Sequence, residues 1–212
     1  MSESFLTIMD FVEAELVEKH SRFLGHMCHT IDKEQSEKFI SKIKSEYKDA
    51  SHNVSAYTIY DTGIMYCSDD GEPQGTAGRP VLEVLKREKI FNVCVVITRY
   101  FGGVLLGTGG LARAYSDTCK LLIKNANFAN CKICDFLTVI VDYSDLSKVE
   151  RIIEDFEVRI LRKDFADKVS VNLLIETEQL DALKNALTNA TAAKAEIKIN
   201  ESNWERIPII KK

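Results

Sequence analysis

The sequence has little that would place it in a membrane or an oxidising compartment. Its 212 residues contain no apolar run near the ~18–20 residues that span a bilayer. The first twenty residues, MSESFLTIMDFVEAELVEKH, are acidic and lack the basic-then-apolar layout of a signal peptide. We therefore expect a cytoplasmic protein whose six cysteines are free thiols rather than a disulfide framework.

A strong basic charge is also absent. The net charge is −4, and it is spread along the chain: residues 1–133 carry 16 basic and 17 acidic groups, and residues 134–212 carry 12 and 15. Neither part is the strongly basic domain that is typical of dedicated nucleic-acid binders, although charges can still cluster in three dimensions. With 45% hydrophobic and 28% charged residues, the composition is that of a folded globular protein.

Glycine is scarce and unevenly placed, with none after Gly110. Eight of the ten glycines lie in two stretches, SDDGEPQGTAGRP (68–80) and TRYFGGVLLGTGGLARAY (98–115). Because glycine is permissive in conformation but entropically costly, this crowding indicates a place where the backbone itself is used.

Hydrophobic periodicity predicts an α+β chain. We expect strands at 13–17, 22–29, 54–60, 64–67, 92–98, 136–143, 157–165, 168–176 and 195–200. We expect helices at 32–47, 81–88, 111–124, 146–155 and 178–190. The run at 92–98 is almost wholly apolar, which is typical of a central strand buried on both faces. From residue 136 the order is βαββαβ, the pattern of ferredoxin-like domains, so we place a domain boundary near 127–135.

The second glycine-rich stretch follows an apolar strand and leads into a helix, an arrangement that favours anions. Backbone N–H groups at a helix N-terminus bind phosphate through hydrogen bonds and the helix dipole. The stretch is neither a Walker A loop nor GxGxxG; its 107–110 segment resembles the phosphate loop of galactokinase and mevalonate-kinase type enzymes. Close packing of the backbone is the alternative interpretation. The candidate phosphate-binding residues are Arg79, Arg99, Gly102, Gly103, Gly107, Thr108, Gly109, Gly110 and Arg113.

The acidic stretch carries further candidates, Asp69, Asp70 and Glu72. Their carboxylates suit Mg²⁺ or acid–base chemistry. The alternative, which we favour, is an acidic turn, because Asp-Gly and Glu-Pro pairs are strong turn signals. For at least one of the three arginines we expect an ion pair with this turn. His52 and Thr76 are either site residues or ordinary loop residues.

Signals for catalysis and for a resident metal are weak. No Ser/His/Asp or Cys/His nucleophile set is readable. Cys131 and Cys134 form a lone CxxC, without the second pair that a structural zinc site needs. We therefore assign no catalytic residue and no metal ligand.

Four motifs together resemble the IMPACT/YigZ family: His20-Ser21-Arg22-Phe23, Ser51-His52-Asn53 with Ala56-Tyr57, and the two glycine-rich stretches. The resemblance covers most of 15–125, and 135–203 look like the C-terminal domain of the bacterial members. It implies a domain at 1–130 with the fold of ribosomal protein S5 domain 2. It also implies a ferredoxin-like domain at 135–205, similar to the last domain of elongation factor G. Eukaryotic members are linked to translational control.

Three hypotheses follow. The first is a non-enzymatic protein that binds RNA or the ribosome and modulates translation. The second is a Mg²⁺-dependent enzyme or sensor that binds a small phosphorylated ligand at the glycine loop. The third is purely structural, with the motifs stabilising the core. Convergence of Arg79, Arg99 and Arg113 on an open cleft would favour binding, whereas their burial against the acidic stretch would favour the third hypothesis.

Overall fold

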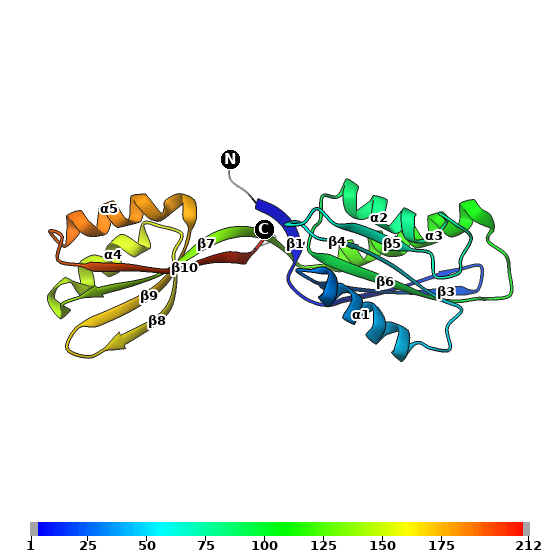
Figure 1. Ribbon diagram of the computed structural model, residues 1–212, viewed down its shortest axis with the longest axis horizontal. Helices are drawn as coiled ribbons and strands as arrows, with labels where there is room; N and C mark the ends of the chain where they lie inside the picture. Colours follow the sequence, from blue (N-terminus) through cyan, green and yellow to red (C-terminus); the bar gives the residue numbers. More distant parts are fainter. Residues whose placement is uncertain (1–3, 210–212) are drawn as a thin grey trace. The chain divides into compact units, whose positions relative to one another are not determined.

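The computed structural model describes residues 4–209, which form two units (Figure 1). One unit comprises Phe5–Asn130 together with residues 206–209, and the other comprises Ser4 and Cys131–Glu205. Both combine helices with antiparallel strands, so the chain is of the predicted α+β class. In the described part of the chain, no helix is long and apolar enough to cross a membrane.

The sheet of the first unit has the strand order β2-β3-β6-β4-β5, and neighbouring strands are antiparallel. Its strands are β2 (Val12–Glu18), β3 (Ser21–His29), β4 (His52–Thr58), β5 (Met65–Ser68) and β6 (Val93–Tyr100). Residues Val93–Arg99 are all buried, so the prediction of a central strand covered on both faces is confirmed. This strand carries Arg99 to one end of the sheet.

Three helices cover the two faces of this sheet: α1 (Lys33–Glu46), α2 (Gly78–Arg87) and α3 (Gly107–Asn125). Helix α1 lies on one face, and α2 and α3 lie on the other (Figure 1). The predicted cap of α1 is confirmed, since the Asp32 carboxylate accepts the Gln35 N–H at 2.7 Å. Gly25 lets α3 approach β3, because a Cβ there would lie 2.9 Å from Leu122.

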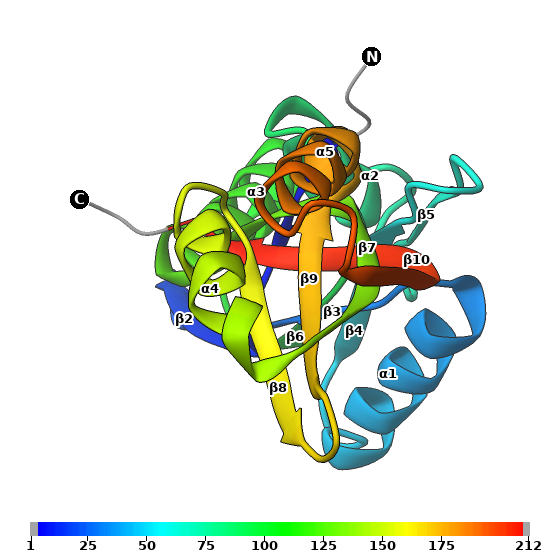
Figure 2. The ribbon, with the colours of Figure 1, turned by 90° about the vertical axis from the view of Figure 1, so that its left-hand side faces the viewer.

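The second unit follows the order β7 (Phe128–Val141), α4 (Leu146–Glu154), β8 (Arg159–Phe165), β9 (Val169–Glu176), α5 (Leu180–Ala190) and β10 (Glu196–Pro208). This is the predicted βαββαβ order. Strand β9 lies between β7 and β8, and β10 pairs with β7. Helices α4 and α5 lie side by side over an apolar core that includes Leu137, Leu173 and Leu187 (Figure 2).

Several boundaries differ from the sequence-based expectations. Strand β1 (Ser4–Ile8) was not predicted; it pairs with β7, which begins at Phe128 rather than at residue 136. Helix α3 begins at Gly107 and not near Leu111, so three glycines lie in its first turn. The expected start was wrong because glycine has low helix propensity, which tertiary context overrides here.

Candidate functional site

Asp69 organises the acidic loop and the start of α2. Its carboxylate accepts hydrogen bonds from the N–H groups of Gly75 at 2.7 Å, Ala77 at 3.1 Å and Gly78 at 2.8 Å. These bonds satisfy backbone donors that would otherwise lack partners at a helix N-terminus. Thr76 supports the same loop, with its hydroxyl donating to the Pro73 carbonyl at 2.6 Å. The contacts of Asp69 and Thr76 therefore support the interpretation of this stretch as an acidic turn.

Asp70 ties the acidic loop to α1 and β4. Its carboxylate accepts hydrogen bonds from Lys44 Nζ at 2.5 Å and from the Asn53 N–H at 2.7 Å. Burial raises the pKa of Asp70, but these two hydrogen bonds outweigh it and leave the pKa below its ordinary value. His52 is held by the same residue, since its Nδ1 donates to the Asp70 carbonyl at 2.8 Å.

Glu72 and Arg99 form a buried ion pair. The carboxylate Oε1 of Glu72 accepts from Arg99 Nη1 at 2.7 Å and from the Tyr115 hydroxyl at 2.8 Å. The Glu72 and Arg99 side chains are only 3% and 7% exposed. Burial, with Glu72 next to the phenol, raises the pKa of Tyr115, so the hydroxyl remains a donor. His52 Nε2 lies 3.9 Å from the second carboxylate oxygen.

The residues around Arg99 join the two glycine-rich stretches. Its guanidinium lies 5.5 Å from the ring centroids of both Phe23 and Phe101. Ser21 Oγ accepts from the Gly102 N–H at 3.2 Å and lies 3.4 Å from Arg99 Nη2. A Cβ at Gly102 would lie 2.0 Å from the carbonyl carbon of His20. Glycine is therefore required there, because the 101–106 loop lies directly against the β2–β3 turn.

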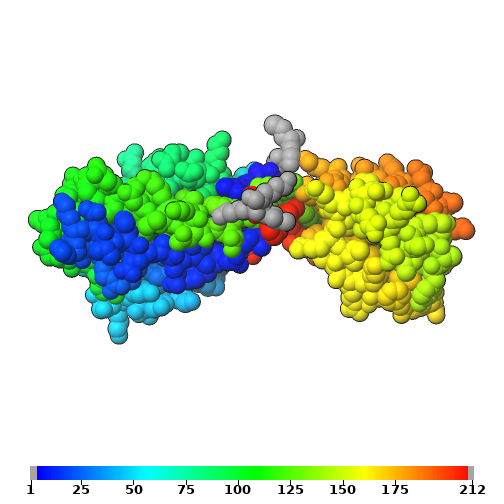
Figure 3. All heavy atoms as spheres, turned by 180° about the vertical axis from the view of Figure 1, so that it is seen from behind, coloured from blue at the N-terminus to red at the C-terminus, as the bar shows by residue number. Residues whose placement is uncertain are grey.

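The first turn of α3 is the part of the site that is open to solvent. Leu106 occupies the cap position, and no described side chain caps the helix start. Gly103 and Gly107 have φ values of +83° and +71°, and a Cβ at either would meet no atom within 4 Å. Thr108 and Gly109 are exposed. On the molecular surface, the β2–β3 segment lies beside α3 (Figure 3).

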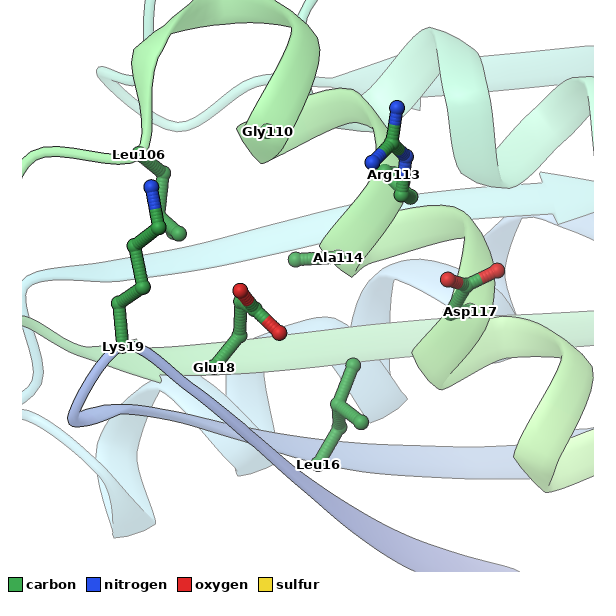
Figure 4. Close-up of a pocket in the computed structure, with 8 residues that line it drawn as sticks. All are labelled: Leu16, Glu18, Lys19, Leu106, Gly110, Arg113, Ala114 and Asp117. Carbon is green, nitrogen blue, oxygen red and sulfur yellow. The ribbon is translucent and has the colours of Figure 1, made fainter.

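A cavity of about 320 Å³ lies between the β2–β3 hairpin and α3 (Figure 4). Leu16, Leu106 and Ala114 form its apolar part, while Lys19 extends toward Leu106. The remaining lining residues are Glu18, Gly110, Arg113 and Asp117. The wall therefore carries both signs of charge, with Asp117 paired to Lys120 at 2.7 Å.

The three candidate arginines thus differ in environment. Arg99 is buried against Glu72, which fulfils the expectation of at least one such ion pair. Arg79 and Arg113 are exposed, and within residues 4–209 neither forms a hydrogen bond or an ion pair. The three carboxylates of the acidic loop are bound to separate protein groups, and the described residues contain no cluster suited to a metal ion.

Sequence reasoning missed Lys19, Ser21 and Tyr115 as site residues. Lys19 and the following His20 have φ values of 46° and 66°, an uncommon pair for residues other than glycine. Their signal was slight, because only a polar break between two predicted strands marked this turn. Ser21 and Tyr115 lie inside the motifs quoted above, but contacts between distant segments are what assign them a role.

Comparison with known proteins identifies the family. The Impact N-terminal domain model matches residues 19–123, and the Domain of unknown function DUF1949 matches residues 139–194. IMPACT family member YvyE of Bacillus subtilis is 34% identical, over 96% of this chain and 94% of its own length. IMPACT family member YigZ of Escherichia coli is 31% identical, over 69% of this chain and 74% of its own length.

Two further relatives extend the comparison. Protein IMPACT of Homo sapiens is 35% identical over 54% of this chain but over only 37% of its own length. A crystal structure described as that of a hypothetical protein is 26% identical, with a TM-score of 0.62, and the match covers 95% of this chain and 99% of the other. The similarity to YvyE and to YigZ spans most of both chains, and the chain belongs to the IMPACT family.

Proposed function

We propose that the protein is a non-enzymatic cytoplasmic binding protein that contacts phosphates of RNA, free or on the ribosome, and modulates translation. The link to translation rests on the family, whose eukaryotic members are linked to translational control. We further propose that the first unit has the fold of ribosomal protein S5 domain 2. The second unit would be ferredoxin-like, like the last domain of elongation factor G, with domain limits at 1–130 and 135–205.

The observation that carries the phosphate contact is the uncapped start of α3 beside Arg113. A helix N-terminus with free backbone donors favours anions, and a planar guanidinium suits phosphate oxygens. Arg113 lies one turn further along α3 on the wall of the cavity, and within residues 4–209 it has no ion-pair partner, so its charge is available to an anion. Lys19 adds a second cation at the same cavity, and Arg79 adds a third in the first turn of α2.

Arg99 acts differently in this proposal. Because Glu72 neutralises it and burial removes it from solvent, it supports the loop rather than touching phosphate. Glu18 lines the same cavity and repels an anion, so the proposed contact is moderate in strength. We therefore expect RNA binding that is weak at physiological salt and that strengthens as salt is lowered.

The experiment is ribosome co-sedimentation and RNA binding over a salt series, with the Arg79→Ala/Arg113→Ala double variant. Each lost phosphate contact is expected to lower the salt slope by about 0.7 to 0.9 and to weaken binding to all sequences alike. Arg87→Ala is the matched control, because Arg87 lies at the other end of α2 and pairs with Glu88. Absence of binding at low salt, or equal loss in the control, refutes the proposal.

A second candidate function is favoured by the cavity itself. About 320 Å³ is enough for a small phosphorylated ligand, held by the α3 amides with Lys19 and Arg113. A thermal-shift screen of nucleotides and sugar phosphates, with and without Mg²⁺, tests it. A ligand at ~100 times its Kd adds ~2.7 kcal/mol to the free energy of unfolding, so a screen without any shift counts against this candidate.

A further inference from the structure

A second cavity lies in the first unit, on the α1 side of the sheet. It has a volume of about 290 Å³ and is lined by Glu13, Ala14, Glu15, Leu24, Gly25, His26 and Tyr47. Helix α1 packs mainly over β4 and β6, and Tyr47 at its C-terminal end lines this cavity, while the Phe11 ring stacks on His26 at 6.3 Å between centroids. Cross-strand pairing places Glu13 opposite His26 and Glu15 opposite Leu24.

The carboxylates that line this cavity, those of Glu13 and Glu15, are hydrogen-bond acceptors. Glu13 is 62% exposed, and its Oε1 lies 3.2 Å from His26 Nδ1. A carboxylate cannot donate, so the proton is on Nδ1. The His26 side chain is only 3% exposed, and its Nε2 has no partner in the described part of the chain. Burial, which outweighs the effect of Glu13, lowers the pKa of His26, so the ring is neutral and Nε2 is an acceptor at neutral pH.

An aromatic ring completes the lining. The Tyr47 ring lies 5.0 Å from the His26 ring, measured between centroids. Cations are attracted to the face of such a ring, and a guanidinium can also stack on it. The chain already pairs a guanidinium with the neighbouring carboxylate, since Arg22 Nε donates to Glu15 Oε1 at 2.8 Å. Glu13 has no such cation partner among residues 4–209.

We propose that this cavity binds an organic cation, a guanidinium group above all, between the Glu13 carboxylate and the Tyr47 ring. The carboxylates of Glu13 and Glu15 repel anions, which separates this site from the proposed phosphate site on the opposite face of the sheet. A cation that carries its own N–H donors suits a carboxylate acceptor beside an aromatic ring, as at Glu13 and Tyr47. Such a group occurs in a free alkylguanidine and in an arginine side chain of a partner protein.

The test is an NMR titration of the full chain with agmatine, with an acetylated arginine amide peptide, and with the neutral urea isostere of agmatine. We expect the ring signals of His26 and Tyr47 to show saturable shifts with agmatine or with the peptide. We expect no such shifts with the urea. Shifts with the peptide alone identify a protein source, and shifts with agmatine as well identify a free guanidine. No saturable shift with either cation, or equal shifts with the urea, overturns the proposal.

Variants make the assignment specific. Glu13→Gln is expected to weaken binding by up to about fivefold, because an ion pair with a side chain that is 62% exposed contributes at most about 1 kcal/mol, which is about fivefold in affinity. Glu18→Gln is the matched control: it makes the same change on the same strand but faces the other cavity. Tyr47→Leu should weaken binding while Tyr47→Phe, which keeps the ring, should not. Circular dichroism verifies that each variant is folded, and equal affinity in Glu13→Gln and Glu18→Gln refutes the site.

Discussion

Replacing Arg99 by methionine should destabilise the first unit strongly. The substitution keeps most of the side-chain volume but leaves the Glu72 carboxylate buried without its cation, since that side chain is only 3% exposed. Removing one partner of a buried ion pair costs roughly 3–5 kcal/mol, mainly as the penalty of the unpaired charge. The Tyr115 hydroxyl still donates to Glu72 and offsets a small part of the loss.

The same reasoning predicts the result of a double variant. In Arg99→Met/Glu72→Gln no buried charge remains, and the carbonyl oxygen of the introduced amide can still accept from Tyr115. The double variant should therefore lose about 2 kcal/mol less than the sum of the two single variants, a coupling within the range of direct contacts. Urea unfolding followed by circular dichroism measures this, provided that the m-value is unchanged. A loss below about 1 kcal/mol in Arg99→Met, or simple additivity, would refute a buried ion pair.

Three other predictions concern Gly102, Gly109 and His29. Gly102→Ala should cost at least about 3 kcal/mol, because its Cβ would overlap the His20 backbone. Gly109→Ala should raise stability by up to about 1 kcal/mol, since it adds helix propensity in open space; thermal unfolding tests both. Burial, with Arg206 nearby, lowers the pKa of His29 to about 4. Between pH 6.5 and 4 the His29 imidazole is therefore neutral in the native state, whereas in the unfolded state, with its ordinary pKa of 6.5, it is protonated. As the pH falls from 6.5 to 4, the free energy of unfolding should therefore decrease by roughly 1–2 kcal/mol, a figure that allows for solvent screening. The His29→Gln variant should lack this decrease. If the variant shows the same pH profile as the wild-type protein, the assignment to His29 is contradicted.

Most helices and strands could be predicted because their signals are local. The apolar run of β6 and the cap at Asp32 act within a few residues, and both are confirmed. The errors occur where local preference and tertiary context disagree. Glycine predicts a loop at 107–110, yet this segment forms the first turn of α3, and β1 is too short to stand out before its pairing with β7 is known.

The sequence predicted which segments form the candidate site, but it did not predict the role of each residue in them. The clustered glycines and acidic residues marked 68–80 and 98–115, and Gly102 and Asp69 now have defined structural roles there. Nothing local distinguished Lys19 from other surface lysines. Its place at the cavity depends on α3, which lies more than eighty residues further along the chain.

By itself, the sequence determined the α+β class, the central strand and the motifs of the IMPACT family, because periodicity and motif spacing are properties of neighbouring residues. Only the tertiary structure decided which of three chemically identical arginines is neutralised. Arg99 meets Glu72 and Tyr115 in the buried interior, whereas Arg79 and Arg113 remain exposed to solvent. The physical reason is that the environment of a charge is set by the side chains that folding brings to it from distant parts of the chain.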